Sequence, residues 1–508
     1  MTDASTNNKR ILKNTVFLYF RMFFVMGISL FTSRIILKNL GVIDYGIYNV
    51  VGGIVTMMAI VNSSMSVSTQ RYITFALGRD DLLGMKKVFS TSLVIYIALS
   101  VVLLLFSETI GLWWVNNKLN IPEERLYATN IIYQFSILSC IFTLLINPFN
   151  AEIIAHEKMD YYAYLSIAEV MMKLLVAYAI TITLYDRLIV YGFLLLVVSM
   201  IILVLYVSYC RRYFKECVFS RNIDSSFFKE LLSYSGWNLF ASISGVAKGQ
   251  GLNVMLNSLF GPEVNASRGV AYQVNAVINQ FFSNFYTAVK PQVTIYYSQK
   301  DYDNMFKLIF RSAKMSFYLI LFVSLPILIE TSAIIDIWLG TTIDYVIPFT
   351  RLIILISAID AMATPLMTLM HATGKIRLYQ IVIGTATLLI LPVSYVLVKY
   401  IGCEPTSVFV VSLITSVFCL FARLFLVNRV ISIPVKKYIL DVFLRCVVIS
   451  LFSSIIPLSL HFWLSPSICN TMIICAASIV SSLCFIYYIG IDNSEREFVN
   501  KYIKKLWI

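Results

Sequence analysis

The residues of this sequence that could do chemistry are charged side chains inside long apolar segments. Arg21, Lys248 and Arg268 lie well inside such segments, and so do the carboxylates Glu169 and Asp360. A charge at the centre of a membrane helix costs about 2.5–3.5 kcal/mol on the insertion scale, so it is expected to face the protein interior or a water-filled cavity. Arg and Lys there would bind an anion, and the planar fork of Arg matches phosphate.

The neighbouring residues suggest how some of these charges are accommodated. Glu169 lies four residues before Lys173, and a Glu–Lys pair at this spacing can form on one helix face. Lys248 lies in the stretch AKGQG, whose two glycines weaken a helix, so we expect a broken helix that lines a cavity. Lys314 and Arg445 are close enough to the predicted inner surface to extend toward it.

The composition indicates an integral membrane protein. Of the 508 residues, 59% are hydrophobic and 13% are charged, and the mean hydropathy is +0.80, whereas soluble proteins carry about 25% charged residues. Runs of about 20 apolar residues indicate membrane helices, because a barrel would show ten-residue alternation. The formal charge of +13 points to cytoplasmic loops and anionic membrane lipids, and not to nucleic acid.

We predict an all-α membrane protein of about fourteen transmembrane helices. The apolar segments are 14–33, 46–68, 88–107, 126–146, 160–183, 188–209, 231–258, 264–289, 308–329, 345–370, 376–398, 406–427, 438–460 and 467–490. Most Lys and Arg residues outside them lie in loops on the side of the N-terminus, which predicts that both termini are cytoplasmic. We expect an N-terminal lobe at 1–225, a C-terminal lobe at 226–430, and two further helices with a cytoplasmic tail at 431–508.

Landmarks that recur at a constant spacing suggest that the two six-helix lobes are repeats. The residues Pro148, Ala155, Lys158 and Tyr162 recur as Pro365, Ala372, Lys375 and Tyr379. At one slightly different spacing, Gly41 and Asp81 recur as Gly261 and Asp301. Because each copy holds six helices, both start on the same side, which predicts parallel repeats related by an axis along the membrane normal. This is the plan of a transporter with a cleft between two lobes.

Motifs for catalysis and metal binding are missing from the sequence. There is no G-x-x-x-x-G-K-[ST] motif for ATP, and residues 156–160, HEKMD, fail the HExxH pattern of a zinc site. The histidines His156, His371 and His461 are far apart in sequence. We therefore expect no enzymatic activity, no cofactor and no metal. An ion gradient or the gradient of the cargo must then drive transport.

Glu169 and Asp360 are the candidates for coupling transport to H⁺ or Na⁺. Lys173 lies one turn from Glu169 and should keep it ionised, which makes Glu169 a poor proton carrier. Asp360 has no obvious partner close by in sequence. We expect Asp360 either to bind a proton or Na⁺, or to pair with a cation such as Arg351.

Short motifs stand out in both lobes. The first lobe has TSRIIL at 32–37, LG at 40–41, DYGIY at 44–48 and QRY at 70–72. The second lobe has GLN at 251–253, FGP at 260–262, NASRGVAYQVN at 265–275, PQV at 291–293, IWLG at 337–340 and ATGK at 372–375. Together they resemble bacterial polysaccharide flippases, the O-antigen and capsule repeat-unit branch of the MATE-like multidrug/oligosaccharidyl-lipid/polysaccharide (MOP) exporter superfamily.

The resemblance covers most of residues 9–430 and implies a cargo. Similar flippases move a polyprenyl-diphosphate-linked oligosaccharide across the bacterial inner membrane by alternating access, for lipopolysaccharide or capsule synthesis. A polysaccharide polymerase and a chain-length regulator are the implied partners. Arginines on the first and eighth helices of such flippases meet the diphosphate, and Arg21 and Arg268 match them. Arg34 and Lys248 are the other expected substrate-binding residues.

Three alternatives stay open. A cation-drug antiporter of the same fold would need carboxylates in the cleft of the first lobe, where the segment 14–33 carries Arg21 and no acid. A peptidoglycan-precursor flippase would share the fold and the charge, so only substrate tests separate it. A membrane polymerase or glycosyltransferase would need a large outer loop or an acidic pair, and the longest predicted outer loop is 107–125.

Overall fold

The computed structural model describes residues 2–56, 59–117, 121–220, 225–339, 344–492, 495–497 and 500. All regular secondary structure in these ranges is helical, as predicted. Ten helical stretches are long and apolar enough to cross a membrane: Leu82–Asn117, Glu123–Ala155, Met159–Ile182, Arg187–Tyr213, Tyr302–Ile329, Val346–Thr373, Arg377–Lys399, Ser407–Ile431, Val435–Trp463 and Ile468–Gly490.

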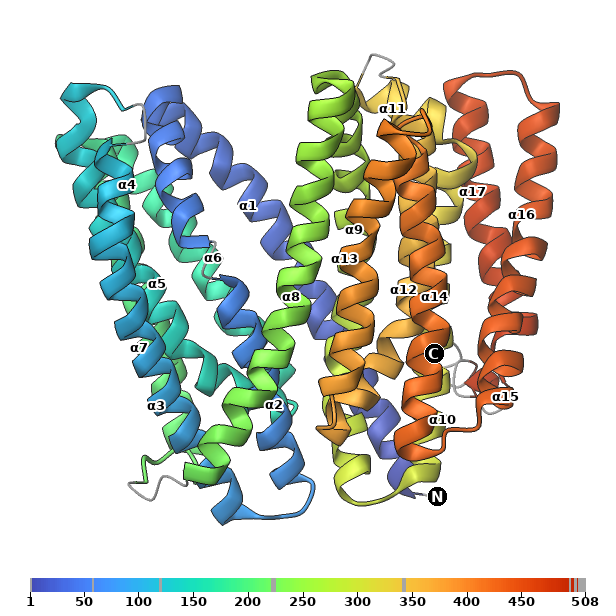
Figure 1. Cartoon of the computed structure of the whole chain (residues 1–508), viewed down its shortest axis with the longest axis horizontal. Coiled ribbons are helices and arrows are strands. Elements are labelled where there is room, and N and C mark those ends of the chain that lie inside the picture. The colour runs from blue at the N-terminus through green and yellow to red at the C-terminus, as the bar shows by residue number, and fades with distance from the viewer. Residues whose placement is uncertain are drawn as a thin grey trace. The chain divides into compact units, whose positions relative to one another are not determined.

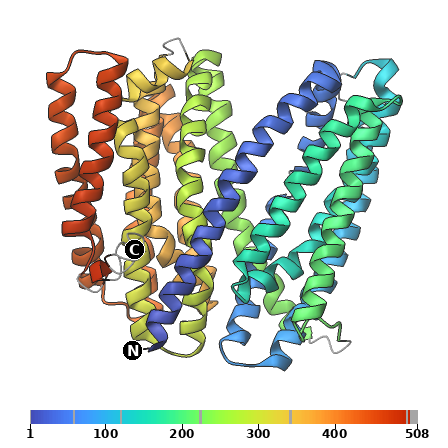
Figure 2. The same cartoon turned by 180° about the vertical axis from the view of Figure 1, so that it is seen from behind.

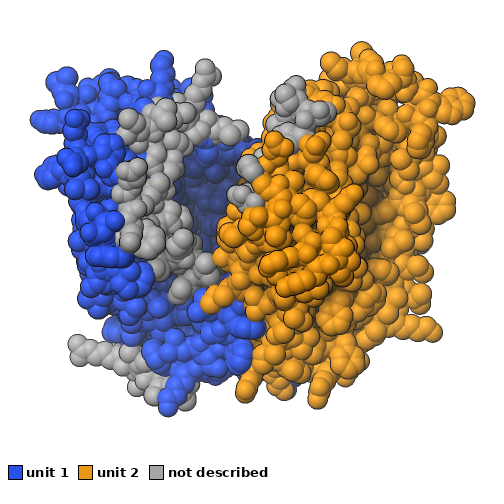
Figure 3. All heavy atoms as spheres, turned by 45° about the horizontal axis from the view of Figure 1, so that its top comes forward, with its two compact units in different colours: residues 1–242, 294–300 blue, residues 243–293, 301–508 orange. Residues whose placement is uncertain are grey.

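The chain divides into two compact units, which Figure 3 colours separately: unit 1 is residues 1–242 and 294–300, and unit 2 is residues 243–293 and 301–508. The helices of unit 1 are α1 (Thr2–Thr56), α2 (Ala59–Leu77), α3 (Leu82–Phe106), α4 (Leu112–Asn117), α5 (Leu126–Ala155), α6 (Met159–Ile182) and α7 (Arg187–Tyr213) (Figure 1). Two helices contribute to both units, α8 (Ser225–Phe260) and α9 (Pro262–Ser298). The other helices of unit 2 are α10 (Tyr302–Ile329), α11 (Thr331–Leu339), α12 (Val346–Thr373), α13 (Arg377–Lys399), α14 (Ser407–Ile431), α15 (Val435–Tyr438), α16 (Arg445–Trp463) and α17 (Ile468–Phe485).

Four long helices, α1, α2, α8 and α9, are less hydrophobic than the other long helices of the described chain. They coincide with the predicted segments 14–33, 46–68, 231–258 and 264–289. The second of these segments is shared between α1, which continues through a kink at Gly41 as far as Thr56, and α2, which begins at Ala59. Polar side chains therefore concentrate on the first two helices of each predicted repeat.

The predicted repeat corresponds to backbone turns that recur in both units. Residues with positive φ, a conformation that costs L-residues energy, occupy matching positions. The matching pairs are Gly41 (φ 76°) with Gly261 (φ 86°), Asp80 (φ 54°) with Lys300 (φ 60°), and Glu157 (φ 57°) with Gly374 (φ 75°). The sequence landmarks thus mark shared chain geometry, although the residue types at two of these three turns differ.

Helix starts and helix packing recur as well. The carboxylate of Asp81 accepts a hydrogen bond from the backbone N–H of Gly84 at the start of α3, and Asp301 accepts one from Asn304 at the start of α10. Within unit 1, α5 packs against α3 and α7, and within unit 2, α12 packs against α10 and α14. The corresponding helices of the two units therefore have corresponding neighbours.

The chain after α17 is held by two cations, of which one is buried and one is partly exposed. Helices α16 and α17 lie side by side (Figures 1 and 2), and both pack against α10. Lys314 of α10, only 3% exposed, donates to Asp492 at 2.9 Å, and Arg445 of α16 donates to the other carboxylate oxygen at 2.5 Å. The expectation that Lys314 and Arg445 extend toward the membrane surface stays a prediction, and both side chains pair with Asp492. Burial raises the pKa of Asp492, but the hydrogen bonds from Arg445 and Lys314 outweigh it and hold that pKa below its usual value.

We expect Asp492→Asn to destabilise the protein at neutral pH by about 1–3 kcal/mol, because the buried ammonium of Lys314 loses an anionic partner. The value should lie at the low end, since 52% of the Asp492 side chain is exposed. A carboxyl group whose pKa is lowered by folding stabilises the folded protein at pH values above its unfolded pKa of about 3.9. This stabilisation is lost as the pH falls through the folded pKa. The Tm values of wild type and variant should therefore converge in acid. Exposed Asp303 gives the control variant Asp303→Asn, and a Tm difference that is constant down to about pH 3 would refute the ion pair.

Candidate functional site

Arg21 of α1 is the deep arginine of unit 1. Helix α1 packs against α6, and the guanidinium of Arg21 lies over the ring of Tyr162, 4.5 Å from its centroid. The Nε atom of Arg21 is buried and has no hydrogen-bond partner within the described chain. Because a cation–π contact supports the charge without neutralising it, the guanidinium keeps N–H donors for an anionic ligand.

Glu169 of α6 is paired, as its spacing predicted. Lys173 donates to Glu169 at 2.6 Å, one turn along the same helix, and both side chains are partly exposed. Buried Tyr206 of α7 lies within electrostatic range of both Glu169 and Arg21. The ion pair leaves Arg21 as the uncompensated charge of this group. The side chain of Arg34 lies outside the described part of the structure.

Arg268 of α9 is the deep arginine of unit 2. One terminal nitrogen donates to the backbone carbonyl of Gly249 at 2.6 Å, and the other donates to Oδ1 of Asn253 at 3.1 Å, both on α8. The guanidinium also lies over the ring of Tyr272, 4.3 Å from its centroid. Its Nε atom is buried, and no described residue bonds to it. These contacts fix the position of Arg268 with neutral groups, so they leave its charge available.

The two glycines that follow Lys248, Gly249 and Gly251, do not break the helix. Helix α8 is continuous through them, so the broken helix predicted there is wrong. Gly249 accepts the hydrogen bond from Arg268, and a Cβ added to Gly251 would lie 2.7 Å from the methyl carbons of Leu391 on α13. Close approach between helices is thus the reason for Gly251. The cost of glycine in a helix is offset by this packing.

Asp360 of α12 lies beside two cations of unit 2. A terminal nitrogen of Arg423, on α14, is 3.9 Å from Oδ1 of Asp360, and Lys248 interacts electrostatically with both residues. That distance is an ion pair without a hydrogen bond, and 47% of the Asp360 side chain is exposed. Arg351, the partner considered from the sequence, donates instead to the backbone carbonyl of Leu328 at 3.1 Å. The sequence did not single out Arg423, which lies near the end of its predicted segment.

The described charges around Arg21 and around Asp360 are mostly positive. Arg21 remains after Glu169 and Lys173 pair, and Asp360 has both Arg423 and Lys248 near it. Guanidinium groups held over aromatic rings, with some N–H donors unused, are suited to bind a phosphate or carboxylate. The arginine side chains of each unit are therefore suited to bind an anion.

Comparison with known proteins gives matches in structure. No family model matches the chain, and no curated protein matches it. An outward-facing multidrug resistance MATE family transporter of the MOP superfamily has a TM-score of 0.72 at 13% identity, with 85% of this chain and 97% of that chain covered. A MATE protein in complex with MaD3S has a TM-score of 0.71 at 14% identity, with coverage of 85% and 97%. A MOP superfamily transporter from Pyrococcus furiosus has a TM-score of 0.66 at 12% identity, with coverage of 84% and 96%.

These likenesses establish the fold. The chain has the fold of MATE transporters of the MOP superfamily over most of its length. Identities this low leave the cargo to be argued from the side chains of this chain, because unrelated functions recur on one fold.

We expect Gly251→Ala to destabilise the protein, because its new methyl group meets Leu391. Overpacking costs about 1–3 kcal/mol, and a side chain that can rotate keeps the cost low. Gly249→Ala is the matched control on the same helix, since nothing lies within 4 Å of its added Cβ and alanine favours a helix by about 1 kcal/mol. Thermal unfolding of the purified protein measures both. Equal Tm values for the two variants would refute the close contact.

Proposed function

We propose that this chain is a flippase that moves a polyprenyl-diphosphate-linked oligosaccharide across the bacterial inner membrane by alternating access. The observation that carries this proposal is a deep arginine in each unit, Arg21 and Arg268. Each lies over a tyrosine ring, and each has a buried Nε to which no described residue bonds. A diphosphate presents several acceptor oxygens, and Arg binds phosphate through two N–H groups at once. The MATE fold supports transport as the activity.

The least hydrophobic long helices carry the proposed substrate-binding residues. Arg21 and Arg34 belong to α1, Lys248 to α8 and Arg268 to α9. Polar membrane helices are tolerated where they line a water-filled space, so we infer that each unit contacts the hydrophilic headgroup through these helices. In this proposal both termini are cytoplasmic, as the loop charges predict. A polysaccharide polymerase and a chain-length regulator would use the flipped units.

A cation-drug antiporter is the second candidate, because a multidrug MATE transporter is among the similar structures. Such a protein needs an available carboxylate for its cargo. Here Glu169 is bonded to Lys173, and Asp360 lies near Arg423 and Lys248. The Pyrococcus furiosus transporter is described as having a binding pocket of reverse polarity that suggests a different function. The charges around Arg21 and Arg268 in this chain favour an anion over a cationic drug.

Arg21→Ala and Arg268→Ala should abolish surface-polysaccharide export while the protein still inserts in the membrane, because each removes the donors proposed to bind the diphosphate. Arg21→Lys and Arg268→Lys should restore export only in part, since Lys has the charge without the bidentate fork. Export is measured by complementation of a flippase-deficient strain. Membrane levels of each variant are measured in parallel.

Arg212→Ala, which removes an exposed arginine at the end of α7, is the matched control and should export normally. Binding of undecaprenyl diphosphate to the purified protein should weaken in both deep-arginine variants and stay normal in the control. Normal export by Arg21→Ala and Arg268→Ala would overturn the anion site. Efflux of ethidium by the wild type in place of export would favour the drug antiporter, and complementation of a peptidoglycan-precursor defect alone would favour that flippase.

We propose that Asp360 couples transport to an H⁺ or Na⁺ gradient, since its ion pair with Arg423 is long and its side chain is half exposed. A carboxylate held this loosely can exchange its partner for a proton or Na⁺. Asp360→Asn should fold normally, and its transport should become insensitive to collapse of the gradient. Glu169→Gln, which alters an acid already bonded to Lys173, should keep the gradient dependence. If Asp360→Asn transports like wild type and still responds to uncouplers, coupling lies elsewhere.

A further inference from the structure

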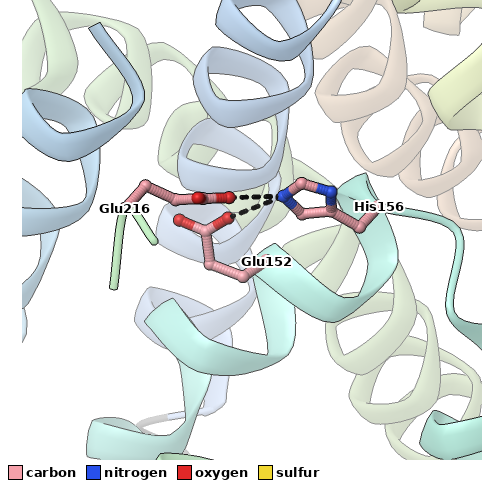
Figure 4. Close-up of side chains that lie close together, drawn as sticks. All are labelled: Glu152, His156 and Glu216. Carbon is pink, nitrogen blue, oxygen red and sulfur yellow. Dashed lines mark hydrogen bonds and ion pairs between the residues drawn. The ribbon is translucent and has the colours of Figure 1, made fainter. Parts of the chain in front are cut away.

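Two carboxylates and an imidazole meet in unit 1 at the end of α5, away from the residues proposed to bind cargo (Figure 4). Glu152 lies in the last turn of α5, His156 follows four residues later, and Glu216 lies in the segment after α7. The Nε2 atom of His156 is 2.5 Å from Glu216 and 3.8 Å from Glu152. Each of the three side chains offers one atom that could bind a metal, and these three atoms all lie within 4.8 Å of one another.

Glu152 is the unusual member of this cluster. Its side chain is completely buried, and neither carboxylate oxygen has a hydrogen-bond partner within the described chain. Figure 4 shows its carboxylate directed at the same imidazole nitrogen as that of Glu216. Lys86 of α3 interacts electrostatically with Glu216. A buried carboxylate that accepts no hydrogen bond costs free energy unless a proton or a cation accompanies it.

The imidazole is held in the orientation that the cluster requires. The ring of His156 stacks on Phe214 with centroids 4.3 Å apart and planes 11° apart. This contact fixes the plane of the ring, in which Nε2 faces the carboxylates, and 21% of the His156 side chain is exposed, so an ion can enter from solvent. Stacking of a ligand histidine restricts its ring in the way that supporting groups restrict ligands in metal sites.

The other unit shows that packing alone does not require these residues. At the spacing that relates Pro148 to Pro365, the positions of Glu152 and His156 are occupied by Leu369 and Thr373. Leu369 is fully buried. The same place in the repeated fold is therefore filled by an apolar side chain, and unit 1 carries the acid and the histidine for another reason.

We infer that Glu152, His156 and Glu216 bind one divalent transition-metal ion, with Zn²⁺ the best fit. Two carboxylates and a neutral imidazole match the charge of a divalent ion, and the three ligands leave a fourth tetrahedral position for water. Ligand atoms on one Zn²⁺ lie roughly 3.3 Å apart, which falls between the two distances from Nε2. Mg²⁺ and Ca²⁺ prefer oxygen ligands, so the imidazole ligand argues against either ion at this site. The ion would fasten the end of α5 to the segment after α7.

The test uses the full-length protein, purified in detergent, stripped with EDTA and titrated with ZnCl₂. One Zn²⁺ should bind per chain, and Glu152→Gln and His156→Ala should lose more than the roughly 10–100-fold in affinity that an outer-shell change costs. His461→Ala is the matched control, because His461 lies 2.6 Å from Glu330 in a His–Glu pair that belongs to no such three-ligand group in the described chain. It should bind Zn²⁺ like wild type.

A measurement on the wild type guards against variants that fail to fold. Zn²⁺ should protect His156 from modification by diethyl pyrocarbonate, mapped by mass spectrometry, and should leave the modification of His461 unchanged. Equal binding by wild type and Glu152→Gln, no stoichiometric binding by the wild type, or unchanged modification of His156 would each overturn the metal site.

Discussion

An ionised side chain loses several kcal/mol of hydration when it is buried, and compensation for this loss orders the charges of the two units. Lys314 is compensated by the carboxylate of Asp492. Arg21 and Arg268 are supported differently, by aromatic rings and, for Arg268, by a carbonyl and an amide. The first kind of support neutralises the cation and serves stability. The second kind keeps the positive charge available to a ligand, which is why these two arginines are central to the proposed function.

Local features were predictable from the sequence, and long-range ones were not. The helical class follows from apolar run lengths, and the Glu169–Lys173 pair follows from the geometry of a single helix turn. The contact between Asp360 and Arg423 depends on how α12 and α14 pack, which no spacing in the sequence reports. The predicted break at Gly251 failed because the propensity of glycine was outweighed by a tertiary contact.

The metal cluster shows a related limit. In an HExxH motif the other residues follow the first histidine. Here the nearest proposed ligand, Glu152, precedes His156 by one helix turn. That spacing alone predicts a shared helix face and could have marked the pair. Glu216 is brought to the pair by the packing of α7 against α5, a contact between residues far apart in sequence that no short motif records.

The recurring turns separate the bending of the chain from its chemistry. Gly41 and Gly261 share a positive φ, and so do Glu157 and Gly374, which have different side chains. Arg10 forms an ion pair with Glu157, the member of the second pair that has a charged side chain. Backbone joints of this kind tolerate residue changes if the new side chain finds local support. The two predicted repeats can therefore differ in charge while they keep the same joints, so a change of side chain at a joint need not change the path of the backbone.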